Sequence, residues 1–396
     1  MSMILSEKVN RIKPSATLAM ANRAAELKAA GQDVIDLSVG EPDFDTPAFI
    51  KQAAIDALNA GFTKYTAVDG IPALKQAIIK KFARENQLNY QAQQIIVSAG
   101  AKQALFNLFA ALLNPGDEVI IPAPYWVSYP DMVLLTDGTP VSIPTTLEQR
   151  FKISAAQLER AITAKTRLLI LNSPSNPSGM AYSRQELAEL GVVLLKHPQI
   201  TIVTDDIYEH ILWTEQPFVN IVNACPELYD RTVVVNGVSK SYAMTGWRIG
   251  YAAGPAALIA GMKKIQSQST SNPNSIAQAA AVAALNGEQS FIQTMCLEFK
   301  RRHDFLLEKI NQIPGLICEP ADGAFYAFVS AQQWLSQHEI KTDLALSEFL
   351  LKEAKVAVVP GSAFGCDGHL RLSYATNIAL LEQAVERIHQ ALALSA

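Results

Sequence analysis

Short apolar runs alternate with longer amphipathic stretches along most of this chain. The apolar runs predict buried strands, and the stretches between them predict helices. The predicted strands are 34–39, 94–98, 118–121, 139–143, 167–172, 201–204, 232–235 and 249–252. The clearest predicted helices among them are 48–60, 101–112 and 184–196. This order favours a mostly parallel sheet that helices cover on both faces.

The pattern changes from about Pro255 onward. A long helical stretch at 291–310 leads into short strands and two more helices, the last at 377–392. We therefore predict two domains, a large one over 46–290 and a smaller one formed by 1–45 together with 291–396. At the start of the large domain, Thr46 is expected to cap the helix at 48–60, with Pro47 in its first turn and Gly61 at its end.

Composition excludes several classes of protein. The 396 residues carry a formal net charge of −4, which argues against a general role on nucleic acid or anionic membranes. The most apolar uncharged segment, Ile249–Met262, contains three glycines and a proline and is too short to span a bilayer. The N-terminus shows no signal-peptide core, so a cytoplasmic location is expected.

Cysteine and histidine spacing gives no sign of a metal site. The four cysteines are far apart with no CxxC pair, and the six histidines form no HExxH motif. Free thiols and no bound metal are the expectation.

The most informative residue is Lys240, in the run Gly237-Val238-Ser239-Lys240. It follows the apolar strand at 232–235. A lysine at the end of a buried strand either costs folding free energy or takes part in the protein's chemistry. Arg248 lies eight residues on, close enough to serve the same pocket. A lysine nitrogen with a neighbouring guanidinium suits an imine to a phosphorylated aldehyde, because the arginine binds the phosphate as a planar fork.

Other polar residues follow the ends of predicted strands, where open α/β sheets bind ligands. Ser98–Lys102 offers backbone amides to an anion at a helix N-terminus, although an ordinary strand–helix turn is the favoured explanation of this segment alone. Asn176 lies in a proline-rich loop that is either a plain turn or a rigid ligand-facing loop. Asp205 either caps a helix together with Asp206 or pairs with a protonated ring nitrogen.

Three further residues have an ordinary structural explanation beside a functional one. Arg371 lies on an alternating strand pattern and is either solvent-facing or a clamp for a carboxylate. Trp126 starts a helix after a strand and either packs in the core or stacks on a flat ring. Tyr65 lies in a predicted loop and alone indicates nothing. Dinucleotide, P-loop and serine-hydrolase motifs are all missing from the sequence.

Taken in order, these segments resemble the class I aminotransferases, pyridoxal-phosphate enzymes of the aspartate aminotransferase family. The resemblance covers nearly the whole chain, from Lys13–Thr17 and Gly40–Phe44 to Val359–Gly361 and Arg371–Tyr374. The segment Gly237–Gly250 matches the family's lysine-attachment pattern at most constrained positions. The resemblance implies fold type I of pyridoxal-phosphate-dependent transferases, an α/β fold with a mostly parallel central sheet flanked by helices and a smaller α/β domain.

The resemblance also implies a role for each matching residue. Lys240 would be the catalytic residue and carry pyridoxal 5'-phosphate as an imine. The cofactor would be bound by Gly100, Ala101 and Arg248 at the phosphate, Asp205 at the pyridine nitrogen, Tyr208 and Asn176 at the ring hydroxyl, Trp126 on the ring face, Lys102 nearby, and Tyr65 from the partner subunit of a homodimer. The substrate would be bound by Arg371 and the Gly40 backbone at the α-carboxylate, with Trp126, Asn176, Lys102 and Thr17 around it.

Two departures from the family pattern stand out, one at the substrate's distal carboxylate and one at the phosphate site. The family's best-known branch has an arginine before its Asn-Pro pair that binds the distal carboxylate, whereas 266–270 contains no basic residue here. The chain is more similar to a branch with a lysine where Lys102 stands. The resemblance implies that this ammonium meets an aspartate or glutamate side chain, with Thr17 nearby. The serine expected three residues before the catalytic lysine is replaced by Gly237.

The resemblance therefore implies transamination between an L-amino acid, with aspartate as the best guess, and 2-oxoglutarate by a ping-pong mechanism. Aromatic amino acids or prephenate as substrates, or another pyridoxal-phosphate reaction such as a β-lyase, stay open. A non-catalytic binding protein on the same fold is disfavoured, because every residue with a chemical role is present.

Overall fold

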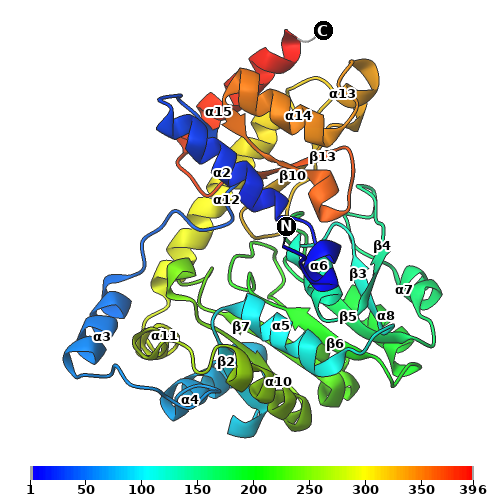
Figure 1. The fold of residues 1–396 in the computed structure, drawn as a ribbon. Coiled ribbons are helices and arrows are strands. Elements are labelled where there is room, and N and C mark those ends of the chain that lie inside the picture. The colour runs from blue at the N-terminus through cyan, green and yellow to red at the C-terminus, as the bar shows by residue number, and fades with distance from the viewer. Residues whose placement is uncertain (1–2, 395–396) are drawn as a thin grey trace.

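A seven-stranded sheet forms the centre of the protein in a computed structural model that describes residues 3–394 (Figure 1). Its strand order is β2-β8-β7-β6-β5-β3-β4, and only β8 runs antiparallel to its neighbours. In that order the strands are Ile95–Ser98, Gly250–Ala253, Thr232–Gly237, Thr201–Asp205, Thr166–Asn172, Glu118–Pro122 and Thr139–Ile143. The prediction of a mostly parallel sheet is confirmed.

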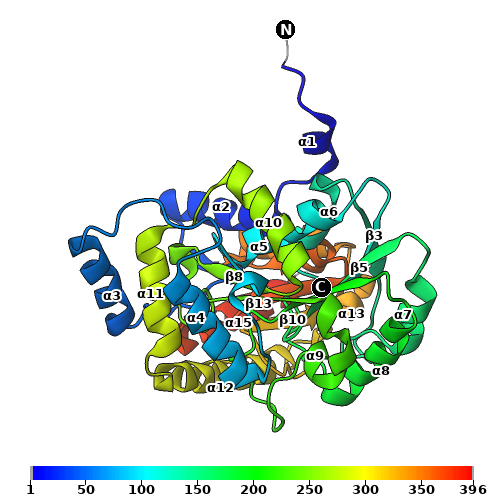
Figure 2. The ribbon, with the colours of Figure 1, turned by 90° about the horizontal axis from the view of Figure 1, so that it is seen from below.

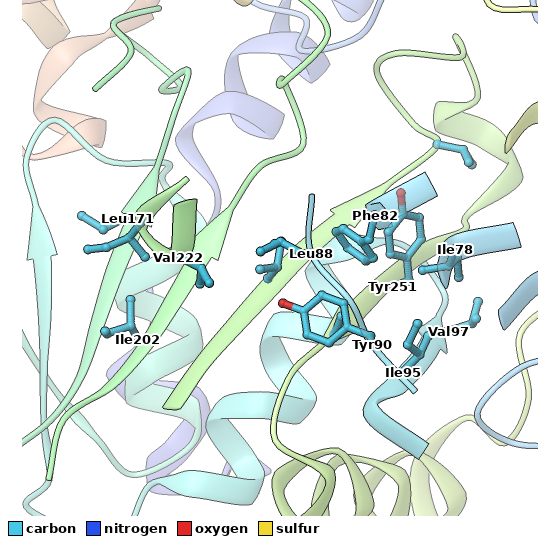
Figure 3. Close-up of a cluster of buried hydrophobic side chains, with 14 of the residues drawn as sticks. Ile78, Phe82, Leu88, Tyr90, Ile95, Val97, Leu171, Ile202, Val222 and Tyr251 are labelled. Atoms are coloured by element: carbon cyan, nitrogen blue, oxygen red, sulfur yellow. The ribbon is translucent and has the colours of Figure 1, made fainter. Parts of the chain in front are cut away.

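Side chains alternate between two apolar cores, one on each face of this sheet. On β2, Ile95 and Val97 join one core, and Ile96 joins the other. Figure 3 shows part of the first core, which α4, α8 and α11 help to cover. The second core packs against α5, α6 and α10. The helices around the large sheet are α3 (Ala48–Asn59), α4 (Pro72–Lys81), α5 (Ala101–Leu112), α6 (Ser128–Leu135), α7 (Ala155–Ala161), α8 (Arg184–Leu195), α9 (Ile221–Ala224), α10 (Ala256–Ser269) and α11 (Ser275–Asn286).

A separate four-stranded antiparallel sheet forms from the C-terminal part of the chain. Its order is β12-β13-β10-β9, with strands Val359–Pro360, His369–Ser373, Tyr326–Ser330 and Ile317–Cys318. The helices of this part are α12 (Ser290–Ile310), α13 (Gln332–Gln337), α14 (Asp343–Phe349) and α15 (Ile378–Ala393). Figure 1 shows α12 running from the large sheet up to this smaller part.

The N-terminal segment joins the C-terminal part through main-chain pairing. β1 (Ile35–Asp36) pairs in parallel with β11 (Val356–Ala357), and α2 (Ala16–Ala29) lies beside them. The short helix α1 (Glu7–Arg11) projects from the body of the protein, as Figure 2 shows. These contacts agree with grouping 1–45 with 291–396, although the boundaries themselves stay a prediction and residues 1–2 and 395–396 lie outside the described part.

Two details of the sequence analysis were wrong. Thr46 does not cap α3, because its hydroxyl donates instead to the carbonyl of Ala243 at 2.6 Å, and Pro47 takes the N-cap position. The strand predicted at 34–39 is limited to Ile35–Asp36. Beyond it, Ser38 folds back so that its amide and hydroxyl both donate to the Asp36 carboxylate, which ends the regular pairing.

All four cysteines are free, as expected. Among residues 3–394, no helix combines the length and apolar character needed to cross a membrane.

Candidate active site

A cavity of about 400 Å³ opens where the carboxyl ends of β5, β6 and β7 meet the C-terminal sheet and the N-terminal segment. The predicted site residues that line it are Thr17, Gly40, Ala101, Lys102, Trp126, Asn176, Asp205, Tyr208, Lys240, Arg248 and Arg371. Two predicted residues do not line it. Gly100 lies just behind the wall, and Tyr65 is 92% exposed.

Lys240 follows β7 and points into this cavity. Its Nζ donates to the carbonyl oxygen of Gly40 at 2.5 Å. Burial lowers the pKa of the Lys240 amine to about 8, and the positive charges of Arg371 and Arg248 act in the same direction. A substantial fraction of the amine is therefore neutral near physiological pH, which is the form that attacks a carbonyl.

Asp205 ends β6 and is fully enclosed by protein. Its Oδ2 accepts a hydrogen bond from the Tyr129 hydroxyl at 2.7 Å, whereas its Oδ1 is buried with no partner. Burial raises the pKa of Asp205 to about 6. A buried carboxylate oxygen without a donor is costly, so this atom is suited to receive an N–H from a ligand. No helix follows β6 here, so the helix-cap explanation of Asp205 and Asp206 was wrong.

The turn between β2 and α5 brings backbone amides to the cavity wall. Gly100 has φ +90°, and a Cβ there would lie 2.3 Å from Nη2 of Arg248. A Cβ on Gly250 would lie 2.1 Å from the Ala101 amide nitrogen. The guanidinium of Arg248 is held against this turn by its bonds to the carbonyls of Thr245 and Ala99. A helix N-terminus with an adjacent guanidinium is a ready anion site.

Arg371 is 1% exposed, on β13, and is not the solvent-facing arginine that the strand pattern also allowed. Its Nη1 donates to Asn176 Oδ1 at 3.0 Å and its Nη2 to the Ser38 carbonyl at 2.6 Å. Its Nε is buried with no partner. Within residues 3–394, the hydrogen bonds of this guanidinium go to an amide oxygen and a carbonyl oxygen, both neutral, so its charge can attract a carboxylate entering the cavity.

Lys102 and Trp126 lie together on another wall. The Lys102 Nζ is 4.8 Å from the centroid of the Trp126 ring, and partial burial together with the charge of Arg248 lowers the pKa of Lys102. The Thr17 hydroxyl nearby is buried with no partner. Trp126 lies two residues before α6 rather than inside it.

Comparison with known proteins identifies the family. Residues 32–388 match the profile described as aminotransferase class I and II. An aspartate/prephenate aminotransferase of Nitrosomonas europaea is 58% identical over 98% of this chain and 99% of its own length. The crystal structure of an aspartate aminotransferase from Rhizobium meliloti has a TM-score of 0.96 at 50% identity, covering 99% of both chains. A Thermus thermophilus aspartate aminotransferase with maleate has a TM-score of 0.93 at 42% identity, covering 98% of this chain and 100% of its own.

The chain belongs to the class I and II aminotransferases. It is an aminotransferase that uses pyridoxal 5'-phosphate, as the family does. The residues present fit that cofactor. The unpartnered Asp205 oxygen suits a protonated ring nitrogen, the side-chain-free turn at Gly100 with Arg248 suits a phosphate, and the Lys240 amine suits the aldehyde carbon.

Several residues of this aminotransferase site escaped the sequence analysis. The cavity is also lined by Ser15, Leu18, Val127, Ser128, Tyr129, Asn172, Ile207, Ser239, Thr245 and Tyr326. Two carried a usable local signal, since Tyr129 lies one helical turn after Trp126 and Ser239 directly precedes Lys240. Tyr326 carried no signal, because it reaches the site only through the pairing of β10 with β13.

A second charged cluster lies outside the cavity. Glu85, Glu209 and His210 place potential ligand atoms within 4.8 Å of one another. Protein groups already satisfy them, since Lys81 is ion-paired with Glu209, Asn236 Nδ2 donates to Glu209 Oε1 at 2.7 Å, and His210 is bonded to Glu85 and Ser241. The expectation of no bound metal stays a prediction.

Proposed function

We propose that this aminotransferase transfers the amino group of aspartate to 2-oxoglutarate in two half-reactions of a ping-pong cycle. The observation that supports the proposal is that one cavity holds a reactive amine together with two cationic side chains. The Lys240 amine shares the cavity with the buried guanidinium of Arg371 and with the ammonium of Lys102. Aspartate, glutamate and 2-oxoglutarate each carry two carboxylates, which these two cations would match.

The cofactor would be held by residues on several elements. Arg248 and the amides around Gly100 and Ala101 would bind the phosphate, and Trp126 would stack on the ring. The remaining ring contacts would be Asp205 at the pyridine nitrogen and Tyr208 with Asn176 at the ring hydroxyl. When bound, pyridoxal phosphate supplies an electron sink that weakens the C–H bond at the substrate Cα.

Lys240 would have two uses. It would carry the cofactor at rest and, once the substrate amino group has displaced it, move the proton from the substrate Cα as a general base and acid. The carbonyl of Gly40 holds the amine on one side of the cavity, and this hydrogen bond would limit the directions from which the amine can approach. Asp205, as an anion, would keep its partner ring nitrogen protonated.

Substrate recognition would depend on charge and on shape. Arg371 would bind the α-carboxylate, because its guanidinium can form two parallel hydrogen bonds. Lys102 would bind the distal carboxylate as a single point charge, and the unpartnered Thr17 hydroxyl, which lines the same cavity, would assist. A point charge selects geometry less strictly than a guanidinium fork, which favours a broader substrate range.

A second candidate reaction is the amination of prephenate, with aspartate or glutamate as the donor. It is supported by the relative from Nitrosomonas europaea, whose name includes both aspartate and prephenate. Prephenate also carries two carboxylates, so the same two cations would meet it. Aromatic amino acids and β-elimination remain weaker candidates, since no described contact favours them.

We also propose that the active enzyme is a homodimer and that Tyr65 completes the cofactor site of the partner subunit. Tyr65 lies on a loop, is 92% exposed, and makes no described side-chain contact within its own chain. The N-terminal segment, which projects from the body in Figure 2, also carries exposed apolar side chains. Met3 is 87% exposed and Ile4 is 94% exposed. Apolar surface of this kind is typical of an interface. The division into 46–290 and 1–45 with 291–396 is proposed as the two domains of each subunit.

The test is a panel of single half-reactions followed by the visible absorption of the bound cofactor. Aspartate and glutamate should convert the holoenzyme from its aldehyde form to its amine form, and 2-oxoglutarate should convert it back. Initial rates with both substrates should give parallel double-reciprocal lines. If aspartate leaves the spectrum unchanged while alanine or phenylalanine changes it, the dicarboxylate assignment is wrong. Prephenate, offered to the amine form, decides the second candidate.

A further inference from the structure

Tyr326 lies where the two sheets meet in the active site. It is fully buried on β10 of the smaller sheet, and its hydroxyl is 2.9 Å from the hydroxyl of Tyr208, which follows β6 of the large sheet. A Cβ on Gly40 would lie 3.1 Å from the same hydroxyl. The hydroxyl oxygen of Tyr326 therefore links the two sheets and also lies beside Gly40, whose carbonyl oxygen accepts from Lys240 Nζ.

The ring of Tyr326 also carries the guanidinium of Arg371. The Cζ atom of Arg371 lies 4.5 Å from the Tyr326 ring centroid and 5.1 Å from that of Phe364. Cation–ring contacts of this kind are stronger when both partners are removed from water, and Arg371 is 1% exposed. Burial raises the pKa of Tyr326, but the positive charge of Arg371 acts against that rise. The acidity of this hydroxyl therefore depends on the charge at Arg371.

The direction of the hydrogen bond between the two tyrosines depends on what else Tyr208 binds, since either hydroxyl can be the donor. Each phenol has one O–H, so only one of the two hydrogens lies between the two oxygens and the other is free to be donated elsewhere. If Tyr208 uses its own hydrogen to bind an oxygen in the cavity, Tyr326 must donate to Tyr208. When the Tyr208 hydroxyl accepts a hydrogen bond, its own O–H becomes more polarised. A stronger bond from Tyr326 therefore strengthens the bond that Tyr208 donates.

We propose that Tyr326 is a positioning residue that couples the carboxylate site at Arg371 to the hydrogen bond that Tyr208 donates to the ring oxygen of the cofactor. A carboxylate bound at Arg371 neutralises the guanidinium, weakens Tyr326 as a donor and so changes the Tyr208 bond. The coupling rests on the proposed roles of Arg371 and Tyr208. As a result, the pH at which the bound cofactor titrates would change when a carboxylate binds at Arg371.

The test uses the holoenzyme and maleate, a dicarboxylate with no amino or oxo group to react. The visible band of the bound cofactor is titrated with pH, with and without saturating maleate. In the wild-type enzyme the midpoint should move when maleate binds. In Tyr326→Phe, which loses one oxygen, that displacement should fall by about half or more. By reciprocity, the pH dependence of the Kd for maleate should flatten by the same factor.

Tyr374→Phe is the matched control. Tyr374 is equally buried, directly follows β13 of the same sheet, donates to the Ala324 carbonyl at 3.4 Å and does not line the cavity, so its variant should keep the wild-type displacement. Thermal melting of both variants checks that they are folded. A full displacement in Tyr326→Phe, or none in the wild type, overturns the proposal.

Arg371→Lys separates this proposal from the proposed function. If Arg371→Lys binds maleate as tightly as the wild type, the carboxylate site is misplaced and the proposed function fails with it. If Arg371→Lys weakens maleate binding while Tyr326→Phe keeps the full displacement, the carboxylate site stands and only the coupling is wrong.

Discussion

The Nζ atom of Lys240 donates a hydrogen bond to the carbonyl oxygen of Gly40, 200 residues earlier in the chain, at 2.5 Å. Gly40 lies just beyond β1, whose pairing with β11 ties it to the C-terminal part of the chain. Lys240 instead follows a central strand of the large sheet. The amine is therefore placed by both parts at once, and the site is complete only when they are packed together.

Asp205 and Asp206 offer a neighbouring pair for testing the charge beside the cofactor ring. Asp205→Asn keeps the shape but removes the anion, and kcat should fall on the order of 10²- to 10³-fold because a preorganised charge is lost. Asp206→Asn is the control. Asp206 accepts from Thr204 and Asn220 Nδ2, and it does not line the cavity. That variant should alter thermal stability with little change in kcat, measured by steady-state kinetics. Equal losses of kcat in both would assign Asp205 a purely structural role.

Arg371 and Lys102 should affect different substrates. Arg371→Ala should raise KM for every amino donor, because all of them carry an α-carboxylate. Lys102→Ala should raise KM mainly for aspartate and glutamate, by about 5- to 50-fold if one exposed charge contact is lost, and should spare alanine. Steady-state kinetics with aspartate and alanine on each variant decide the matter. Parallel losses for both donors in Lys102→Ala would remove its selectivity role.

The pH dependence of cofactor attachment should report the Lys240 amine. Its pKa is lowered to about 8, so the neutral, reactive form increases as pH rises through 8 and is nearly complete above 9. Attachment of pyridoxal phosphate to enzyme stripped of cofactor should accelerate with a midpoint near pH 8, followed by the growth of the visible band. Arg371→Gln removes a charge that lowers this pKa, so its midpoint should move upward. A rate that keeps rising toward pH 10 in the wild type would contradict the lowered pKa.

Much of the site could be predicted because its residues stand at strand ends that local patterns reveal. Lys240, Asp205 and Asn176 each follow an apolar run, so their shared edge of the sheet followed from the parallel arrangement. Arg371 could be placed on a strand, but its burial could not, because that depends on how β13 packs on the large sheet. Tyr326 was missed for the same reason, since no local pattern tells which residue of β10 meets Tyr208. Thr46 was wrongly assigned because a distant carbonyl, that of Ala243, competes for its hydroxyl.

Tyr65 should act only across subunits. Tyr65→Ala and Lys240→Ala should each be nearly inactive alone. When the two variants are dissociated, mixed and reassociated, hybrid dimers should regain activity, because one of their two sites combines an intact Lys240 with the partner's intact Tyr65. The readout is transaminase activity of the hybrid, isolated with two different affinity tags. A mixed dimer as inactive as its parents would show that Tyr65 does not serve the neighbouring site.

The most direct test of the whole account is to reduce the holoenzyme with borohydride and map the modified residue. The account predicts that the visible band disappears and that mass spectrometry finds one reduced pyridoxal phosphate per chain, on the peptide that contains Lys240. Lys240→Ala should take up no covalent label and show no transamination. A label on Lys102 or on any other lysine, or a Lys240→Ala enzyme with near-normal turnover, would contradict the central assignment.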